Sequence, residues 1–263
     1  MSEELKLGTL SWLVPLLFVG CAAWVIWNGP AYIIAFGGAS DALKNVHTTA
    51  GLIDYIALLG LPVTFIWGLF HIHLAKMEYE SMDGFDRASL FLGRVTMLLV
   101  ALLVSVMLYE VVLRYAFERP TLWANELSLW IAGFVFLLSG LYAMAQRSHI
   151  RIFILYDVMP RWLQKTCDVI STVLIVIFAF ALIYGGYGEA TSKFLRWETF
   201  GTAFDPPIPA TIKPLCLFVI TLVAIQAVSN LIMDWNKAPE HHSADEVDED
   251  EIEMLKRTLG SDD

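Results

Sequence analysis

The chain has 263 residues, of which 57% are apolar and only 17% are charged, and its mean hydropathy is +0.61. In a soluble domain about a quarter of all residues are charged. Here charged side chains are missing from several long stretches. These values exclude an ordinary soluble enzyme.

The formal net charge of −10 belongs mainly to one end of the sequence. Residues 240–263 contain ten acidic and two basic side chains, whereas residues 1–239 contain seventeen acidic and fifteen basic ones. The body of the protein is therefore nearly neutral, and no basic patch remains that would bind nucleic acid. The acidic tail has too few apolar residues to fold alone, and we expect it to be solvated.

Six apolar stretches are long enough to cross a membrane as helices, which takes about 20 residues each. In chain order they are Leu7–Trp27, Tyr55–Ala75, Val95–Leu113, Leu127–Ala145, Val169–Gly188 and Leu215–Met233. They are too long and too uniformly apolar for the strands of a membrane barrel. The predicted fold class is an all-α integral membrane protein with six transmembrane helices.

The first stretch is expected to be a retained helix, because it follows Ser2-Glu3-Glu4 and lacks the basic start of a signal peptide. Asn28-Gly29-Pro30 should end it, since proline has no amide donor and glycine is permissive. The remainder, Ala31–Gly38, is too short to cross and should lie at the interface or against protein. A carboxylate at the bilayer centre costs about 3 kcal/mol, which places Asp54 at the mouth of the second helix.

Lys and Arg residues in the loops indicate the orientation, because they are enriched on the cytoplasmic side of a membrane. With the N-terminus inside, the cytoplasmic segments contain eleven of these residues and the opposite side contains six. Both termini are therefore predicted to be cytoplasmic.

The sequence contains little that suggests catalysis or a cofactor. It has no P-loop, and Cys21, Cys167 and Cys216 lie in or beside apolar stretches without zinc-site spacing. We read these cysteines as small hydrophobic residues. A haem between His71 and His149 stays open as an alternative, because both are expected near the cytoplasmic surface. Otherwise we expect no enzyme activity, no cofactor and no metal.

Polar and small residues within the apolar stretches have mainly structural interpretations. Glu110 and Arg114 form an i, i+4 pair in the favourable order, which lowers the cost of burying either charge. A proton or ion site is the functional alternative for this pair. Gly133, Ser139 and Gly140 should let other helices approach the fourth apolar stretch closely.

Three motifs resemble one family of membrane proteins. From Arg114 the sequence reads RYAFERPTLWANELSLW, from His149 it reads HIRIFILYDVMP, and the last stretch contains Gln226 in LVAIQAVSNLI. In this order and spacing they resemble the small membrane subunit of tripartite ATP-independent periplasmic (TRAP) transporters, the DctQ-like family. The resemblance covers about residues 85–235, so the first two helices and the acidic tail are additions to the four-helix pattern of the family.

The resemblance implies three parts and a scaffold role. Residues 1–78 would be a two-helix N-terminal extension, residues 79–237 a DctQ-like four-helix bundle with a short interfacial amphipathic segment, and residues 238–263 a cytoplasmic tail. Such a subunit lies in the bacterial inner membrane and supports a large elevator-type membrane subunit. The complex takes up an organic acid or similar solute, driven by sodium and delivered by a soluble periplasmic binding protein.

The resemblance also assigns roles to single residues. It implies that Arg114, Tyr115, Pro120, Trp123 and Glu126 hold the periplasmic turn between two helices, with Arg114 and Glu126 paired across it. The alternative is that such residues stabilise the turn without touching a partner.

Two further segments receive roles. His149 and Arg151 would position the cytoplasmic amphipathic segment. In the long periplasmic loop expected from Ala190 to Pro214, four charged residues are candidates for contact with the binding protein. They are Lys193, Arg196, Glu198 and Asp205.

Two other classes of function remain open at this stage. One is a membrane anchor or cytochrome-like subunit of a respiratory complex, which would bind haem. The other is a transporter or channel that works without a second polypeptide.

Overall fold

The computed structural model describes residues 2–38, 41–72, 84–146 and 159–235, and every regular element in these ranges is an α-helix. The helices are α1 (Ser2–Trp27), α2 (Gly29–Ala35), α3 (Asp41–Lys44), α4 (Leu52–His71), α5 (Gly84–Ala116), α6 (Ala124–Ala145), α8 (Arg161–Leu195) and α9 (Ile208–Asp234). Five of them are long and apolar enough to cross a membrane, and the bent pair α1–α2 makes a sixth span if it is counted as one. The predicted all-α membrane fold is confirmed.

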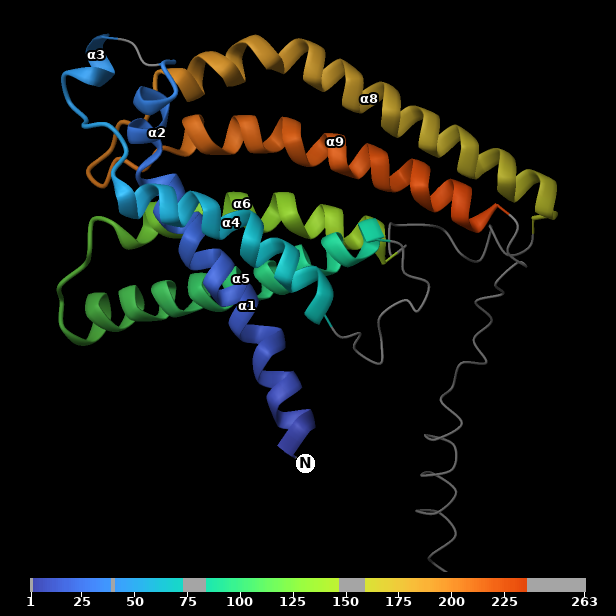
Figure 1. Cartoon of the computed structure of the whole chain (residues 1–263), viewed down its shortest axis with the longest axis horizontal. Coiled ribbons are helices and arrows are strands. Elements are labelled where there is room, and N and C mark those ends of the chain that lie inside the picture. The colour runs from blue at the N-terminus through green and yellow to red at the C-terminus, as the bar shows by residue number, and fades with distance from the viewer. Residues whose placement is uncertain (1, 39–40, 73–83, 147–158, 236–263) are drawn as a thin grey trace, which may run out of the picture.

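The long helices pack as three hairpins placed side by side. The closest packing joins α1 with α4, α5 with α6, and α8 with α9, while α6 also packs on α9 and α1 on α5. In Figure 1 the order from top to bottom is α8, α9, α6 and α5, and α1 and α4 cross over this row where they pack on α5. Residues 28–38, 41–51, 117–123 and 196–207 gather at one end of these helices, which we call the loop end.

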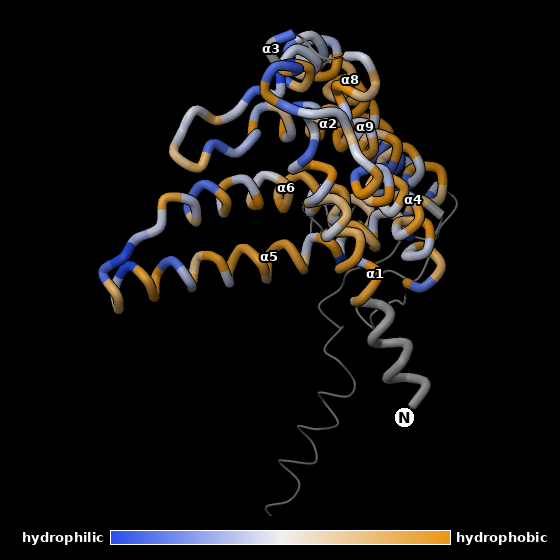
Figure 2. The backbone as a smooth tube through the Cα atoms, turned by 60° about the vertical axis from the view of Figure 1, so that its left-hand side comes forward, coloured by the Kyte–Doolittle hydropathy of each residue, from blue (hydrophilic) through white to orange (hydrophobic). Residues whose placement is uncertain are grey.

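Several helices are longer than the apolar stretches that predicted them. Helix α5 has 33 residues and α8 has 35, because polar turns continue each helix beyond its apolar part. The prediction of a loop from Ala190 to Pro214 was wrong, since only residues 196–207 separate α8 from α9. Proline is tolerated in the first turn of a helix, where amides have no partner, so Pro207 and Pro209 allow α9 to begin early. Figure 2 shows the apolar residues along the helices and hydrophilic ones at the α5–α6 turn.

The predicted break at Asn28-Gly29-Pro30 is confirmed. The axes of α1 and α2 are bent by 66° at this point, and Pro30 occupies the first turn of α2, where its missing amide costs nothing. Tyr32 and Ile33 of α2 are buried. The short helix therefore lies against the rest of the protein.

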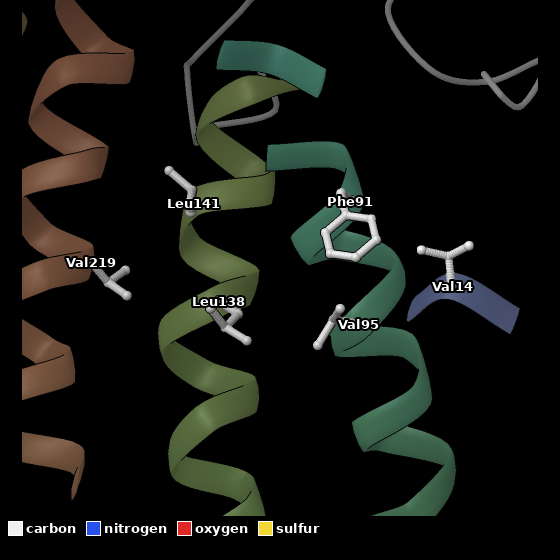
Figure 3. Close-up of a cluster of buried hydrophobic side chains, with 6 residues drawn as sticks. All are labelled: Val14, Phe91, Val95, Leu138, Leu141 and Val219. Atoms are coloured by element: carbon white, nitrogen blue, oxygen red, sulfur yellow. The ribbon is translucent and has the colours of Figure 1, made fainter. Parts of the chain in front are cut away.

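The apolar core runs through the centre of the row of helices (Figure 3). Its buried members, from α1 across to α9, are Val14, Phe91, Val95, Leu141, Leu138 and Val219. The Phe91 ring meets Phe18 of α1 and Phe65 of α4 edge-on, with ring centroids 5.4 Å apart in each case. Gly68 of α4 leaves the space for this ring, because a Cβ there would lie 2.1 Å from the Cε2 atom of Phe91.

Of the two glycines among the three small residues predicted to allow close helix approach, only Gly133 does so. A Cβ on Gly133 would lie 2.9 Å from the Cδ1 atom of Ile212 in α9, whereas a Cβ on Gly140 would have no neighbour within 4 Å. The hydroxyl of Ser139 is exposed and donates to the backbone oxygen of Phe136 at 3.1 Å. Gly140 therefore lies where no other described helix approaches α6 closely.

Replacing Gly133 with valine is expected to lower the free energy of unfolding by about 1 kcal/mol, because Ile212 must move to make room. Gly140→Val is the matched control on the same helix, with open space around its Cβ. Unfolding of the purified protein in mixed micelles, followed by tryptophan fluorescence, measures both variants. Equal effects of the two substitutions would contradict the packing described for α6 and α9.

Candidate functional site

Glu110 closes the turn between α5 and α6 at the loop end. Its buried carboxylate accepts hydrogen bonds from Arg114 Nη2 at 2.6 Å and Nε at 3.1 Å, so the predicted i, i+4 pair forms. The other carboxylate oxygen accepts from the backbone N–H and the hydroxyl of Thr121, at 3.0 and 2.5 Å. Thr121 Oγ1 in turn accepts from the backbone N–H of Ala124 at the start of α6. One carboxylate therefore ties the end of α5 to the start of α6.

Glu126 does not pair with Arg114, which corrects the pairing implied by the resemblance. Its Oε2 atom accepts from the hydroxyl of Thr202 at 2.5 Å and from the backbone N–H of Phe204 at 3.3 Å. The physical reason is that Arg114 is already held by Glu110 on its own helix. Glu126 instead links the start of α6 to the 196–207 loop.

The aromatic residues near this turn have separate roles. The rings of Trp123 and Tyr109 are stacked, with centroids 6.0 Å apart. Tyr115, in the last turn of α5, and Pro120, in the turn between the helices, are exposed. On α6, Trp130 donates from Nε1 to the hydroxyl of Thr211 in α9 at 2.8 Å. This last contact joins two hairpins, and the sequence reasoning did not anticipate it.

The 196–207 loop uses most of its charged residues internally. Lys193 forms an ion pair with Glu198, and the backbone N–H of Gly201 donates to Asp205 Oδ1 at 2.6 Å. The side chain of Arg196 is exposed at the end of α8. Of the four candidates for contact with a binding protein, Lys193, Glu198 and Asp205 have these partners, whereas no hydrogen bond or ion pair of the Arg196 side chain is seen among the described residues.

Asp54 lies in the first turn of α4, as predicted, and joins α1 to α4 at the loop end. Its carboxylate accepts from Trp24 Nε1 at 2.9 Å and from the backbone N–H of Gly51 at 2.8 Å. Its backbone oxygen accepts from the hydroxyl of Tyr32 at 2.7 Å. The carboxylate satisfies an N-terminal amide of the helix, which explains why an acid is stable at this position.

A buried polar cluster at the opposite end was missed by the sequence reasoning. The side-chain amide of Gln226 in α9, which is fully buried, donates to Asp86 Oδ1 at 2.5 Å and to Asn230 Oδ1 at 2.9 Å. Its oxygen accepts from Ser89 at 3.2 Å, and Asn230 donates to the backbone oxygen of Met144 at 2.7 Å. The cluster thus connects α5, α6 and α9.

The sequence did contain a signal for this cluster. Asp86 and Ser89 are three residues apart, and Gln226 and Asn230 are four apart, so each pair shares one helix face. Polar residues that share a face of a membrane helix usually find partners on a neighbouring helix.

Some predicted residues lie outside the described ranges. These are His149 and Arg151, with the amphipathic segment that they would position, and the acidic tail. The haem hypothesis also depends on His149. In the described residues, the Nδ1 atom of His71 lies 3.0 Å from the backbone oxygen of Trp67, and no group of three or more metal-ligating side chains occurs.

Replacing Glu110 with alanine is expected to loosen the α5–α6 turn, because Arg114 and Thr121 lose their shared acceptor. Exchange of the backbone amide hydrogens of residues 117–123, measured on the purified protein by mass spectrometry, should become about tenfold faster, as expected when local opening becomes easier. Glu118→Ala, in the same turn and exposed, should leave the rate nearly unchanged. An unchanged rate in Glu110→Ala would show that this carboxylate does not hold the turn.

Comparison with known proteins gave one family. The model of the family described as "Tripartite ATP-independent periplasmic transporters, DctQ component" matches residues 103–236. This range runs from the middle of α5 to the end of α9 and includes the α5–α6 turn and the 196–207 loop. No curated protein and no solved structure matches the chain.

Proposed function

Because the chain belongs to the DctQ component family of tripartite ATP-independent periplasmic transporters, we propose that it is the immobile scaffold that holds the large, moving membrane subunit of such a transporter. The observation that carries this proposal is the family match over residues 103–236, which includes α6, α8 and α9 completely and the C-terminal part of α5. Helices α1 to α4 precede the matched range.

The use of buried polar groups supports a scaffold rather than a solute pathway. In the described helices, Thr64, Thr96 and Ser128 are buried, and each hydroxyl donates to a backbone oxygen of its own helix. Glu110 and Gln226 are held in the contacts given above. A pathway needs polar groups that are available to the solute, whereas these are engaged within the protein.

Helix α8 supports the same role through its surface. Its buried residues are Gln164, Ala179 and Ala190, while large apolar side chains such as Phe180 and Tyr184 are 69% and 83% exposed. A helix with apolar residues around most of its circumference is suited to lipid or to another membrane subunit. Such a surface widens the part of the complex that stays fixed in the bilayer.

The orientation and the remaining partners are part of the proposal. The loop end faces the periplasm, both chain termini face the cytoplasm of a bacterium, and the complex lies in the inner membrane. A soluble binding protein delivers an organic acid or similar solute to the periplasmic side. The 196–207 loop, with its exposed Arg196, contacts this binding protein. A sodium gradient drives the large subunit.

Co-purification tests this proposal most simply. A tagged copy of the chain, expressed in its native host and extracted in mild detergent, should retain one multi-span membrane protein at a fixed ratio. A similarly tagged unrelated membrane protein of equal abundance is the control. Recovery of the chain alone, or a haem absorption band in the purified sample, would contradict the scaffold role.

A further inference from the structure

The 196–207 loop has a backbone that must be held in place. Trp197 has φ of 49° and Asp205 has φ of 56°, in the left-handed region that residues other than glycine rarely adopt. Gly201, with φ of 82°, adopts this region without a steric penalty. Such a conformation persists only where surrounding contacts enforce it.

The helix α6 provides one set of these contacts. Glu126 binds Thr202 and the backbone N–H of Phe204, as described above. These bonds hold the later part of the loop, but they do not reach Trp197 at its start.

The N-terminal segment, defined as helices α1 to α4 (residues 2–71), provides the second set. The ring of Trp197 lies against the backbone of Gly29, so closely that a Cβ on Gly29 would be 1.9 Å from the Cη2 atom of the ring. The ring centroids of Trp27 and Phe204 lie 6.3 Å apart. A Cβ on Gly38 would be 3.3 Å from the Cδ2 atom of Leu195. Three contacts therefore join the N-terminal segment to the α8–α9 hairpin at the loop end.

The bend after α1 brings these residues to the loop. Helices α1 and α4 pack on each other and on α5, whereas α8 packs on α9, and Gly29 is the first residue after the bend between α1 and α2. The 66° bend and the absence of a side chain on Gly29 together form a slot for the indole ring.

We propose that the N-terminal segment holds the 196–207 loop, through the Gly29 slot for Trp197, in the conformation that the soluble periplasmic binding protein recognises. The identity of the partner in this inference rests on the proposed function. The holding of the loop by the Gly29 slot does not. It gives helices α1 to α4, which precede the family match, a positioning role at the surface that receives the binding protein.

The test replaces Gly29 with leucine, which should displace the Trp197 ring from its slot. Gly20→Leu is the matched control, because Gly20 lies in α1 with nothing within 4 Å of its Cβ position. Spin labels on cysteines introduced at Thr199, two residues after Trp197, and at Leu129, in a background without Cys21, Cys167 and Cys216, report the distance between the start of the loop and α6. Pulsed electron paramagnetic resonance should give one narrow distance distribution in the unmodified protein and in Gly20→Leu, and a broad one in Gly29→Leu.

The second measurement is binding of the soluble protein to the complex of this chain with the large subunit in nanodiscs. If Gly29→Leu leaves about a tenth of the molecules in the competent loop conformation, the apparent Kd rises about tenfold. Unfolding curves should show that both leucine variants are fully folded under the conditions of the binding measurement, which separates positioning of the loop from unfolding of the chain.

Trp197→Ala provides a second route to the same result, because it empties the slot without changing α2. An unchanged distance distribution in both Gly29→Leu and Trp197→Ala would overturn the inference. So would a broadened distribution with unchanged binding, since the loop conformation would then be irrelevant to the partner. Failure of the unmodified complex to bind any soluble protein would overturn the proposed function, while the distance measurement on the chain alone would still decide whether the slot holds the loop.

Discussion

Replacing Phe91 with alanine is expected to lower the free energy of unfolding by about 3 kcal/mol. The ring is 1% exposed and lies where α1, α4 and α5 meet, edge-on to Phe18 and Phe65. In a bilayer the loss comes mainly from packing contacts rather than from water transfer, because lipid tails are as apolar as the core. The value is therefore placed at the low end of those known for buried aromatic residues. Unfolding in mixed micelles, followed by tryptophan fluorescence, measures it.

Phe178→Ala is the matched control for this prediction. Phe178 lies on α8 and is 60% exposed, so its removal should change the free energy of unfolding by less than about 0.5 kcal/mol. A second readout is the attachment of α1 and α4, since crosslinking of cysteines placed in α4 and α5 should weaken only in Phe91→Ala. If the two phenylalanine variants were equally stable, the junction of α1, α4 and α5 would not be a packed core.

Replacing Gln226 with leucine is expected to lower the free energy of unfolding by about 2 kcal/mol. The amide makes three side-chain hydrogen bonds, to Asp86, Ser89 and Asn230, and each such bond in a membrane protein contributes about 0.6 to 1 kcal/mol. The leucine fits the volume of the site, so the loss reports the hydrogen bonds rather than a cavity. The same unfolding measurement applies.

Thr221→Val is the control on the same helix. Thr221 is exposed, and its hydroxyl donates to the backbone oxygen of Leu217 in α9 itself, so the variant should be almost as stable as the unmodified protein. A loss in Gln226→Leu no larger than that in Thr221→Val would show that the cluster does not join α5, α6 and α9.

The sequence predicted those features that depend on local composition. Apolar runs near the length of a bilayer located all the long helices, because no other element satisfies its backbone hydrogen bonds in lipid. The break at Asn28-Gly29-Pro30 followed from two residues that disfavour a continuing helix. The position of Asp54 at a helix mouth followed from the cost of burying a charge.

Contacts between helices could not be predicted in the same way. The pairing of Glu126 with Thr202 and Phe204 depends on how α6 lies beside the 196–207 loop, and a single sequence does not give that arrangement. Gly133 and Gly140 are seven residues apart on one helix, yet only Gly133 meets a neighbour closely. Residue type shows that a close approach is possible, whereas the tertiary structure decides where it occurs.

The length of the loop between α8 and α9 was overestimated for a related reason. Residues 190–195 and 208–214 contain charged and polar side chains, which indicate a loop in an aqueous setting. In the structure they form helical turns, in which Lys213 pairs with Glu189 between the two helices. Hydropathy therefore marks where helices leave the apolar layer, not where they end.

Reconstitution of transport tests the central claim, that this chain supports a moving subunit and moves no solute alone. Proteoliposomes would contain the chain alone, the large membrane subunit alone, or both, each with the loaded soluble binding protein outside and an inward sodium gradient. The account predicts uptake of labelled solute only when both membrane subunits are present. Uptake by vesicles that contain this chain without the large subunit would contradict it.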